Sequence, residues 1–228
     1  IERLKALCDN LGATLVFLTG EDVEEQVADE VEFLDLAVQK MEGLLRVGYG
    51  DAGTEIIARN LRGTSEKVDP MLPGEKIEGV CAFVVLVDFG LVTQHLNEKI
   101  MLYANLVGEV VHKCVVKSGG SPNKNMGPAI LCMWKDAELS VMADGAYKAM
   151  QEAMEVVKTH QGLNELIKGC ASLQKARPGF TVQLKAGLHT GWVIEGAVGS
   201  THKIDASYLS PHVNMTARIE TASFQFGV

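Results

Sequence analysis

The stretch "GGSPNKNMGPAILCMW", residues 119–134, has the pattern of a hairpin tip followed by a buried strand. Glycines flank a polar segment at residues 119–127, and the run "AILCMW" that follows is apolar at nearly every position. Pro128 sits directly after the glycine of the tip. Proline lacks an N–H and fixes its own φ, so it is tolerated at the first position of a strand but brings no ligand atom there. The hairpin therefore anchors the fold prediction, and Pro128 bears on the chemistry.

Working outward from this hairpin, strand and helix patterns alternate. We expect a strand at 79–89, a helix at 97–117, a strand at 129–134, a helix at 137–160, two strands within 180–200 that turn at Thr190-Gly191, and a helix from 210 to 226 capped by Ser210 with Pro211 at its first position. A polar loop is expected between residue 160 and the later strands. This order predicts an α+β domain with a mostly antiparallel sheet covered on one side.

The N-terminal part shows a different pattern. Apolar residues recur at helical spacing from Glu21 to Val47: Val23, Val27, Val31, Leu34, Val38, Met41 and Leu45. Such a helix could pack on its own domain or pair with a second copy as a coiled coil. Turn-forming residues on both sides of "TEIIARNL" predict a linker as far as about Lys76. We therefore predict a helical and linker segment at 1–76 and a second domain at 79–228.

Composition excludes several classes of protein. The chain has 228 residues, 47% of them hydrophobic, and a formal net charge of −8, without the clustered lysines and arginines that nucleic-acid binding requires. Its longest apolar run, "VCAFVVLV", is far shorter than the roughly 20 residues that span a bilayer. Five cysteines without a CxxC pair favour reduced thiols and an intracellular, cytoplasmic location. Because the chain starts at Ile1, we expect it to be a segment of a longer protein.

Three motifs in order, "GGSPNKNMG", "GLHTGWVIEGAVGS" and "KIDASYLSPHVNMTARIE", resemble the catalytic domain of class III nucleotidyl cyclases, the adenylyl and guanylyl cyclase family. The resemblance runs from about Gly79 to the end of the chain. It implies a ferredoxin-like, palm-type fold whose domains pair head to tail, so that two chains share each active site. In that site a ribose 3′-hydroxyl attacks its own α-phosphate and pyrophosphate leaves.

The resemblance assigns four residues to nucleotide contacts. In the family pattern V-N-x-x-x-R, Asn214 would orient the ribose and Arg218 would contact the α-phosphate; the i, i+4 spacing places both on one helix face. Lys124 stands where the family has its base-reading lysine, and Ser207 occupies the position of that lysine's partner. The pair favours adenine weakly, because a serine hydroxyl both donates and accepts. The alternatives are a solvated Lys124 in a turn and an Arg218 paired with Glu220.

The family's two metal-binding aspartates have no counterpart. The F-x-D pattern counted from Phe83 puts Val85 at the first position, and the G-D pattern of the hairpin puts Pro128 at the second. Neither side chain offers an oxygen, so we expect no metal or other cofactor on this chain alone, and Mg²⁺ only if a partner domain supplies the carboxylates. In a shifted register Asp88 would be a ligand, but strand alternation should turn it away from Val85. His112 and His189 each stand alone in their elements and are expected to be structural.

These residues favour one function over two others. The favoured one is the metal-less half of a shared cyclase site, in a homo- or heterodimer with a second cyclase-type domain and with an ATP-like nucleotide as candidate ligand. The second is a structural or regulatory module that has lost turnover, and the third is a self-sufficient cyclase with altered ligands. The sequence stops at "FQFGV", before the last strands in which the family carries a phosphate-binding lysine. Whether those strands are missing or trimmed stays open.

Overall fold

The structure is a computed structural model that describes residues 33–41, 43–44, 47–48, 53–54, 73–200 and 203–226. The chain divides into two compact units, Ile1–Gly48 and Tyr49–Val228. The expected linker falls mostly outside the described residues.

The described part of the first unit is helical. Residues 33–41, 43–44 and 47–48 all have helical backbone, which confirms the helical N-terminal segment there. Leu34, Val38 and Met41 of the predicted stripe are exposed. The earlier stripe residues and Leu45 lie outside the described residues, so both packing alternatives remain. Across the described residues, no helix combines the length and hydrophobicity needed to cross a membrane.

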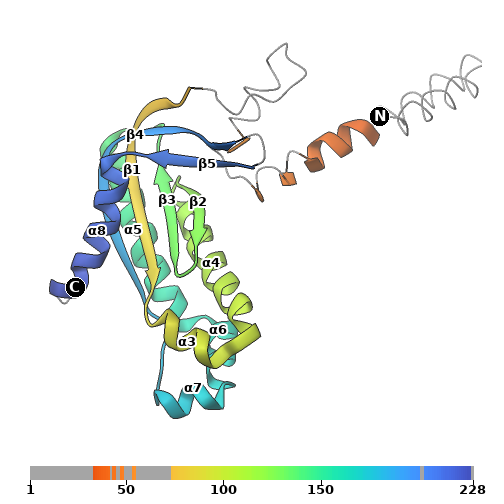
Figure 1. The fold of residues 1–228 in the computed structure, drawn as a ribbon, viewed down its shortest axis with the longest axis vertical. Helices are drawn as coiled ribbons and strands as arrows, with labels where there is room; N and C mark the ends of the chain where they lie inside the picture. Colours follow the sequence, from red (N-terminus) through yellow and green to blue (C-terminus); the bar gives the residue numbers. More distant parts are fainter. Residues whose placement is uncertain are drawn as a thin grey trace, which may run out of the picture. The chain divides into compact units, whose positions relative to one another are not determined.

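The second unit is built on one antiparallel sheet (Figure 1). Its strands are β1 (Glu75–Leu86), β2 (Ser121–Met126), β3 (Ala129–Trp134), β4 (Leu184–Ser200) and β5 (Lys203–Leu209), in the order β2-β3-β1-β4-β5. Every neighbouring pair is antiparallel. Strand β3 matches the predicted strand at 129–134, and the ferredoxin-like sheet is the one predicted.

The helices connect and cover these strands. They are α3 (Phe89–Leu96), the 3₁₀ turn η1 (Asn97–Lys99), α4 (Ile100–Lys117), α5 (Leu139–Thr159), α6 (Gln161–Lys168), α7 (Ala171–Ala176) and α8 (Pro211–Phe226). The predicted helices at 97–117, 137–160 and 210–226 are confirmed within a few residues. The expected polar loop after residue 160 is wrong, because α6 and α7 form there and bury Leu163, Ile167 and Leu173.

Strand β4 differs most from the sequence prediction. The expected turn at Thr190-Gly191 does not exist: Thr190 pairs with Val80 and Gly191 with Gly79 in one unbroken ladder with β1. The long partner strand β1, which begins at Glu75 rather than Gly79, holds these residues extended and overrides their turn preference. Strand β4 instead continues to Ser200 and pairs antiparallel with β5, a strand that the sequence reading missed.

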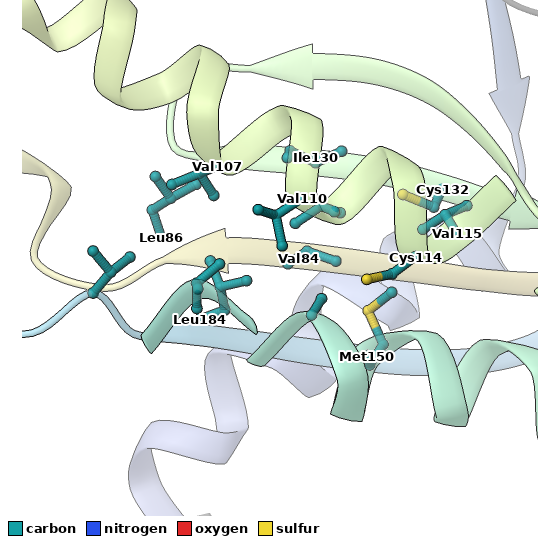
Figure 2. Packing of buried hydrophobic residues seen from close by; sticks show 14 of the residues in the cluster. Val84, Leu86, Val107, Val110, Cys114, Val115, Ile130, Cys132, Met150 and Leu184 are labelled. Carbon is teal, nitrogen blue, oxygen red and sulfur yellow. The ribbon is translucent and has the colours of Figure 1, made fainter. Parts of the chain in front are cut away.

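The main core lies between one face of the sheet and helices α4 and α5. Every second residue of β1, from Val80 through Ala82 and Val84 to Leu86, points into it. Figure 2 shows residues of β1, such as Val84 and Leu86, packed among side chains of the helices, such as Val110 and Cys114 of α4 and Met150 of α5. The alternation of buried positions along β1 is what a strand with one face on a core requires.

Helix α8 covers the opposite face, so the expectation of a sheet covered on one side is wrong. A second cluster there joins Cys81, Met133, Val193, Ala206 and Tyr208, with Val213 of α8 packed against it. The predicted cap is confirmed: the Ser210 hydroxyl accepts from the N–H groups of His212 (3.0 Å) and Val213 (3.1 Å).

Helix α8 approaches the backbone of β4 unusually closely. A Cβ on Gly187 would lie 2.4 Å from the Thr216 carbonyl oxygen and 2.6 Å from the Glu220 nitrogen. Both atoms belong to the helix backbone and cannot rotate aside. Glycine at this position is therefore required for the observed packing of α8.

We expect Gly187→Ala to lower the free energy of unfolding by about 1 to 3 kcal/mol, because an added methyl overpacks a contact made of backbone atoms. The measurement is urea unfolding followed by circular dichroism. Gly90→Ala in α3 is the matched control, since a Cβ there meets nothing within 4 Å. Equal stability of the two variants would contradict the close approach of α8 to β4.

Candidate nucleotide site

Two strands at opposite edges of the sheet meet through their side chains. The Lys124 Nζ of β2 donates to the Ser207 Oγ of β5 at 3.4 Å. Because β2 and β5 are the first and last strands in the sheet order, this contact requires the sheet to curl strongly. In Figure 1 the ends of β4 and β5 bend over toward the side on which β2 and β3 lie. The curl brings together the two residues that the motifs assign to base recognition.

A buried ionic network holds this curl. Lys135, directly after β3, donates to both carboxylate oxygens of Glu195 on β4, at 2.9 and 2.8 Å. The Tyr208 hydroxyl of β5 donates to the same carboxylate at 2.9 Å. Glu195 is only 6% exposed, so removing either donor would leave a buried charge poorly compensated. The network fixes β5 relative to β3, and with it the place of Ser207.

Lys124 lies within β2 rather than at the hairpin tip. Its strand has a bulge between Pro122 and Lys124, and the tip follows at Gly127, whose φ is +61°. Bulges redirect side chains at the edges of sheets. At Asn125, the next residue of β2, the side-chain Oδ1 lies 3.1 Å from the Nε2 of His112 on α4. Asn123, at the bulge, has a buried side-chain oxygen without a hydrogen-bond partner among the described residues.

Asn214 and Arg218 stand one turn apart on α8, and both are exposed. The helix begins four residues after Ser207, which places its first turns beyond the end of β5. Glu220, the alternative partner of Arg218, instead accepts from the Thr221 hydroxyl at 3.4 Å. Within the described residues, no hydrogen bond links Asn214 or Arg218 to Lys124. The structure thus joins Lys124 with Ser207 and leaves the other two facing solvent.

The two positions that the resemblance assigns to metal ligands lie side by side. Val85 pairs with Ala129, and the N–H of Leu86 donates to the Pro128 carbonyl at 2.9 Å. This arrangement fits the register that the motifs imply, but the side chains are apolar and cannot hold a metal ion. Lys185 is the partner of Val85 on β4, so an ammonium group rather than a carboxylate is its polar neighbour across the ladder. The place formed by Val85 and Pro128 therefore does not fit Mg²⁺.

Asp88, the alternative metal ligand, is bound to a residue outside the sheet. Strand β1 ends at Leu86, and Asp88 adopts φ 57° at the start of α3, where it forms an ion pair with Arg177. It therefore leaves the sheet, rather than alternating along it as the longer predicted strand required. The described residues contain no group of three or more histidine, cysteine or acidic side chains placed to hold a metal.

Sequence reasoning treated His189 as isolated and overlooked His212. In the structure His189 Nε2 and His212 Nδ1 are 3.0 Å apart. The two residues are 23 positions apart on a strand and a helix, so no spacing rule connects them. The only local signal is Gly191, which leaves room for the His212 ring: a Cβ there would lie 2.4 to 2.7 Å from ring atoms.

Solved structures share this arrangement of strands and helices. A bacterial light-regulated adenylyl cyclase matches with a TM-score of 0.63 at 19% identity, over 87% of this chain and 54% of that one. The guanylate cyclase domain of RhGC from Catenaria anguillulae, solved in complex with GTP, matches with a TM-score of 0.53 at 19% identity, over 64% of this chain and 74% of that one. The second unit has the fold of adenylyl and guanylyl cyclase domains. The resemblance predicted from the motifs is therefore confirmed.

Two sequence matches accompany this cyclase fold. An adenylate cyclase from Anabaena cylindrica is 28% identical over 116 residues, which is 50% of this chain and 21% of that protein. The chain thus spans about a fifth of this curated relative and about half of the light-regulated cyclase. Residues 9–62 match the family described as the RasGEF all-helical domain; the match covers well under half of the chain and ends before β1.

If Val85 and Pro128 occupy the two metal positions, the double variant Val85→Asp, Pro128→Asp should bind Mn²⁺ at least about tenfold more tightly than the native chain, because paired carboxylates are the ligands that such ions prefer. Each single variant should gain much less. The measurement is Mn²⁺ titration followed by electron paramagnetic resonance.

The uncharged double variant Val85→Asn, Pro128→Asn is the control for folding. A folded aspartate variant without added Mn²⁺ affinity would show that the register of the motifs has been misassigned.

Proposed function

We propose that this chain is the metal-less half of a shared nucleotidyl cyclase site, to which it contributes the base, ribose and phosphate contacts. The observation that carries the proposal is the contact between Lys124 and Ser207, in a chain whose Val85 and Pro128 are apolar at the positions that the resemblance assigns to metal ligands. The base-reading side of the site is thereby assembled while the metal side is lost. The partner is a second cyclase-type domain that has both carboxylates, and the complex is intracellular.

Lys124 and Ser207 would read the base. Their hydrogen bond of 3.4 Å is long and joins two flexible polar groups, so a base edge can replace it. The ammonium donates to a ring nitrogen of adenine, and the serine hydroxyl accepts from the exocyclic amino group. Serine can also donate, so the preference for adenine over guanine is modest.

Asn214 and Arg218 would act on the sugar and phosphate. Their side chains leave α8 one turn apart and reach solvent, where a ligand held between two domains would lie. The Asn214 amide orients the ribose so that its 3′-hydroxyl faces the α-phosphate. The Arg218 guanidinium donates to the phosphate oxygens on which negative charge accumulates as the 3′ O–P bond forms and pyrophosphate departs.

A second function is favoured by one observation. Asn214 and Arg218 are exposed, and no hydrogen bond among the described residues links them to Lys124 or Ser207. A regulatory or structural module that keeps the fold without binding nucleotide would show the same arrangement. The two functions differ in whether substitutions at these residues affect a paired, active complex.

We expect the chain alone to make no cyclic nucleotide, and a mixture with an aspartate-bearing cyclase domain to do so. In the mixture, Arg218→Ala should lower kcat by roughly a hundredfold or more, because the lost donor acts on charge that develops in the transition state. Lys124→Ala should mainly raise KM or weaken base preference, because base contacts persist from the ground state to the transition state. Steady-state assays with ATP and GTP measure both effects.

The matched control is Lys148→Ala, which removes an exposed lysine from α5. If the mixed complex forms and turns over, yet Arg218→Ala and Lys124→Ala behave like this control, the chain is a scaffold and the second function holds.

A further inference from the structure

Two histidines join the first turn of α8 to β4. His212 is the second residue of the helix, and its Nδ1 lies 3.0 Å from the Nε2 of His189. The rings are stacked, with centroids 5.2 Å apart and an interplanar angle of 24°. Both side chains are half-buried. The pair is thus a specific contact between helix and sheet rather than a chance encounter of solvated side chains.

The surroundings of His212 are shaped to receive it. Gly191 leaves the space into which the ring fits, and the Trp192 ring meets it edge-on at 5.6 Å with an interplanar angle of 81°. On the helix side, the Thr216 hydroxyl donates to the His212 carbonyl at 2.9 Å. The ring therefore cannot shift far without moving the first turn of α8.

We propose that the hydrogen bond between His189 and His212 positions the first turns of α8, and with them Asn214 and Arg218, and that protonation of both rings opens it. The two histidines are positioning residues. The effect on Asn214 and Arg218 as nucleotide contacts rests on the proposed function, whereas the role of the hydrogen bond between His189 and His212 in holding α8 does not.

The chemistry of the imidazole ring makes this bond depend on protons. In a neutral pair, or a pair with one extra proton, one nitrogen donates and the other accepts. When both rings are protonated, two N–H donors with like charge face each other and the bond is lost. Histidine side chains change charge between about pH 5 and 8.

The neighbouring groups do not compensate for a second proton. From β1, Cys81 is the register partner of His189, and burial raises the pKa of its thiol to about 11, so it stays uncharged in this range. Lys76 lies 5.0 Å from the Trp192 ring centroid, and Glu78 is the register partner of Trp192.

The charged residues of β4 and α8 that remain to be considered lie at least four positions along the chain from His189 or His212. On β4, Lys185 and Glu195 share the face of His189, four and six positions away, and Glu195 is bound to Lys135 and Tyr208. On α8, Arg218 and Glu220 lie six and eight residues after His212. Within the described residues, no hydrogen bond places a carboxylate on either ring.

The test is hydrogen exchange of the full chain at pH 7.5 and 5.5, with protection corrected for the intrinsic pH dependence of exchange. In the native chain, protection of the amides of residues 214–219 should fall about tenfold at the lower pH, the effect of losing one ordinary hydrogen bond, while that of α5 stays constant. In His189→Leu, which can neither donate nor accept, protection should already be low at pH 7.5 and independent of pH. His95→Leu, which removes a histidine from α3, should behave like the native chain.

Equal protection of α8 at both pH values in the native chain would overturn the proposal, and so would a native pH response in His189→Leu. If that variant does not fold, His212→Leu tests the same bond. This measurement needs no nucleotide. If Arg218→Ala does not lower kcat in the mixed complex but the exchange pattern is as expected, the proposed function is refuted, while the role of the His189–His212 hydrogen bond in holding α8 is supported.

Discussion

The packing of α8 directly on the backbone of β4 is the constraint on which the rest of the unit depends. A helix can lie this close only where the strand carries no side chains, and Gly187 and Gly191 provide those two places. The missing side chain of Gly187 leaves room for the helix backbone, and that of Gly191 leaves room for the His212 ring. This contact sets where α8 runs across the sheet, and therefore where Asn214 and Arg218 enter solvent.

The curl of the sheet contributes the other half of the candidate site. Glu195, held by Lys135 and Tyr208, draws the far part of β4 and β5 toward the end of β3. An ionic group that is so deeply buried stabilises little by itself, but its geometry admits few alternatives. Lys124 and Ser207 meet as a result, although they lie on strands at opposite edges of the sheet.

Local signals in the sequence were sufficient for elements whose structure is locally determined. The Ser210 cap with Pro211, the apolar strand at 129–134 and the long helices all depend on residues within a few positions of each other. Long-range pairing decided the rest. Thr190 and Gly191 favour a turn in isolation, yet β1 holds them extended, and the histidine pair joins residues that no periodicity connects. The Lys124 and Ser207 contact was predictable only through the resemblance to cyclases.

The central claim is that this chain reads the base of a nucleotide bound between two domains. Photo-crosslinking with 8-azido-ATP in a mixture with an aspartate-bearing cyclase domain, followed by peptide mapping, tests it most directly. The account predicts adducts on β2 or β5 of this chain, close to Lys124 and Ser207, and their loss when unlabelled ATP competes. Adducts confined to the partner domain would contradict it.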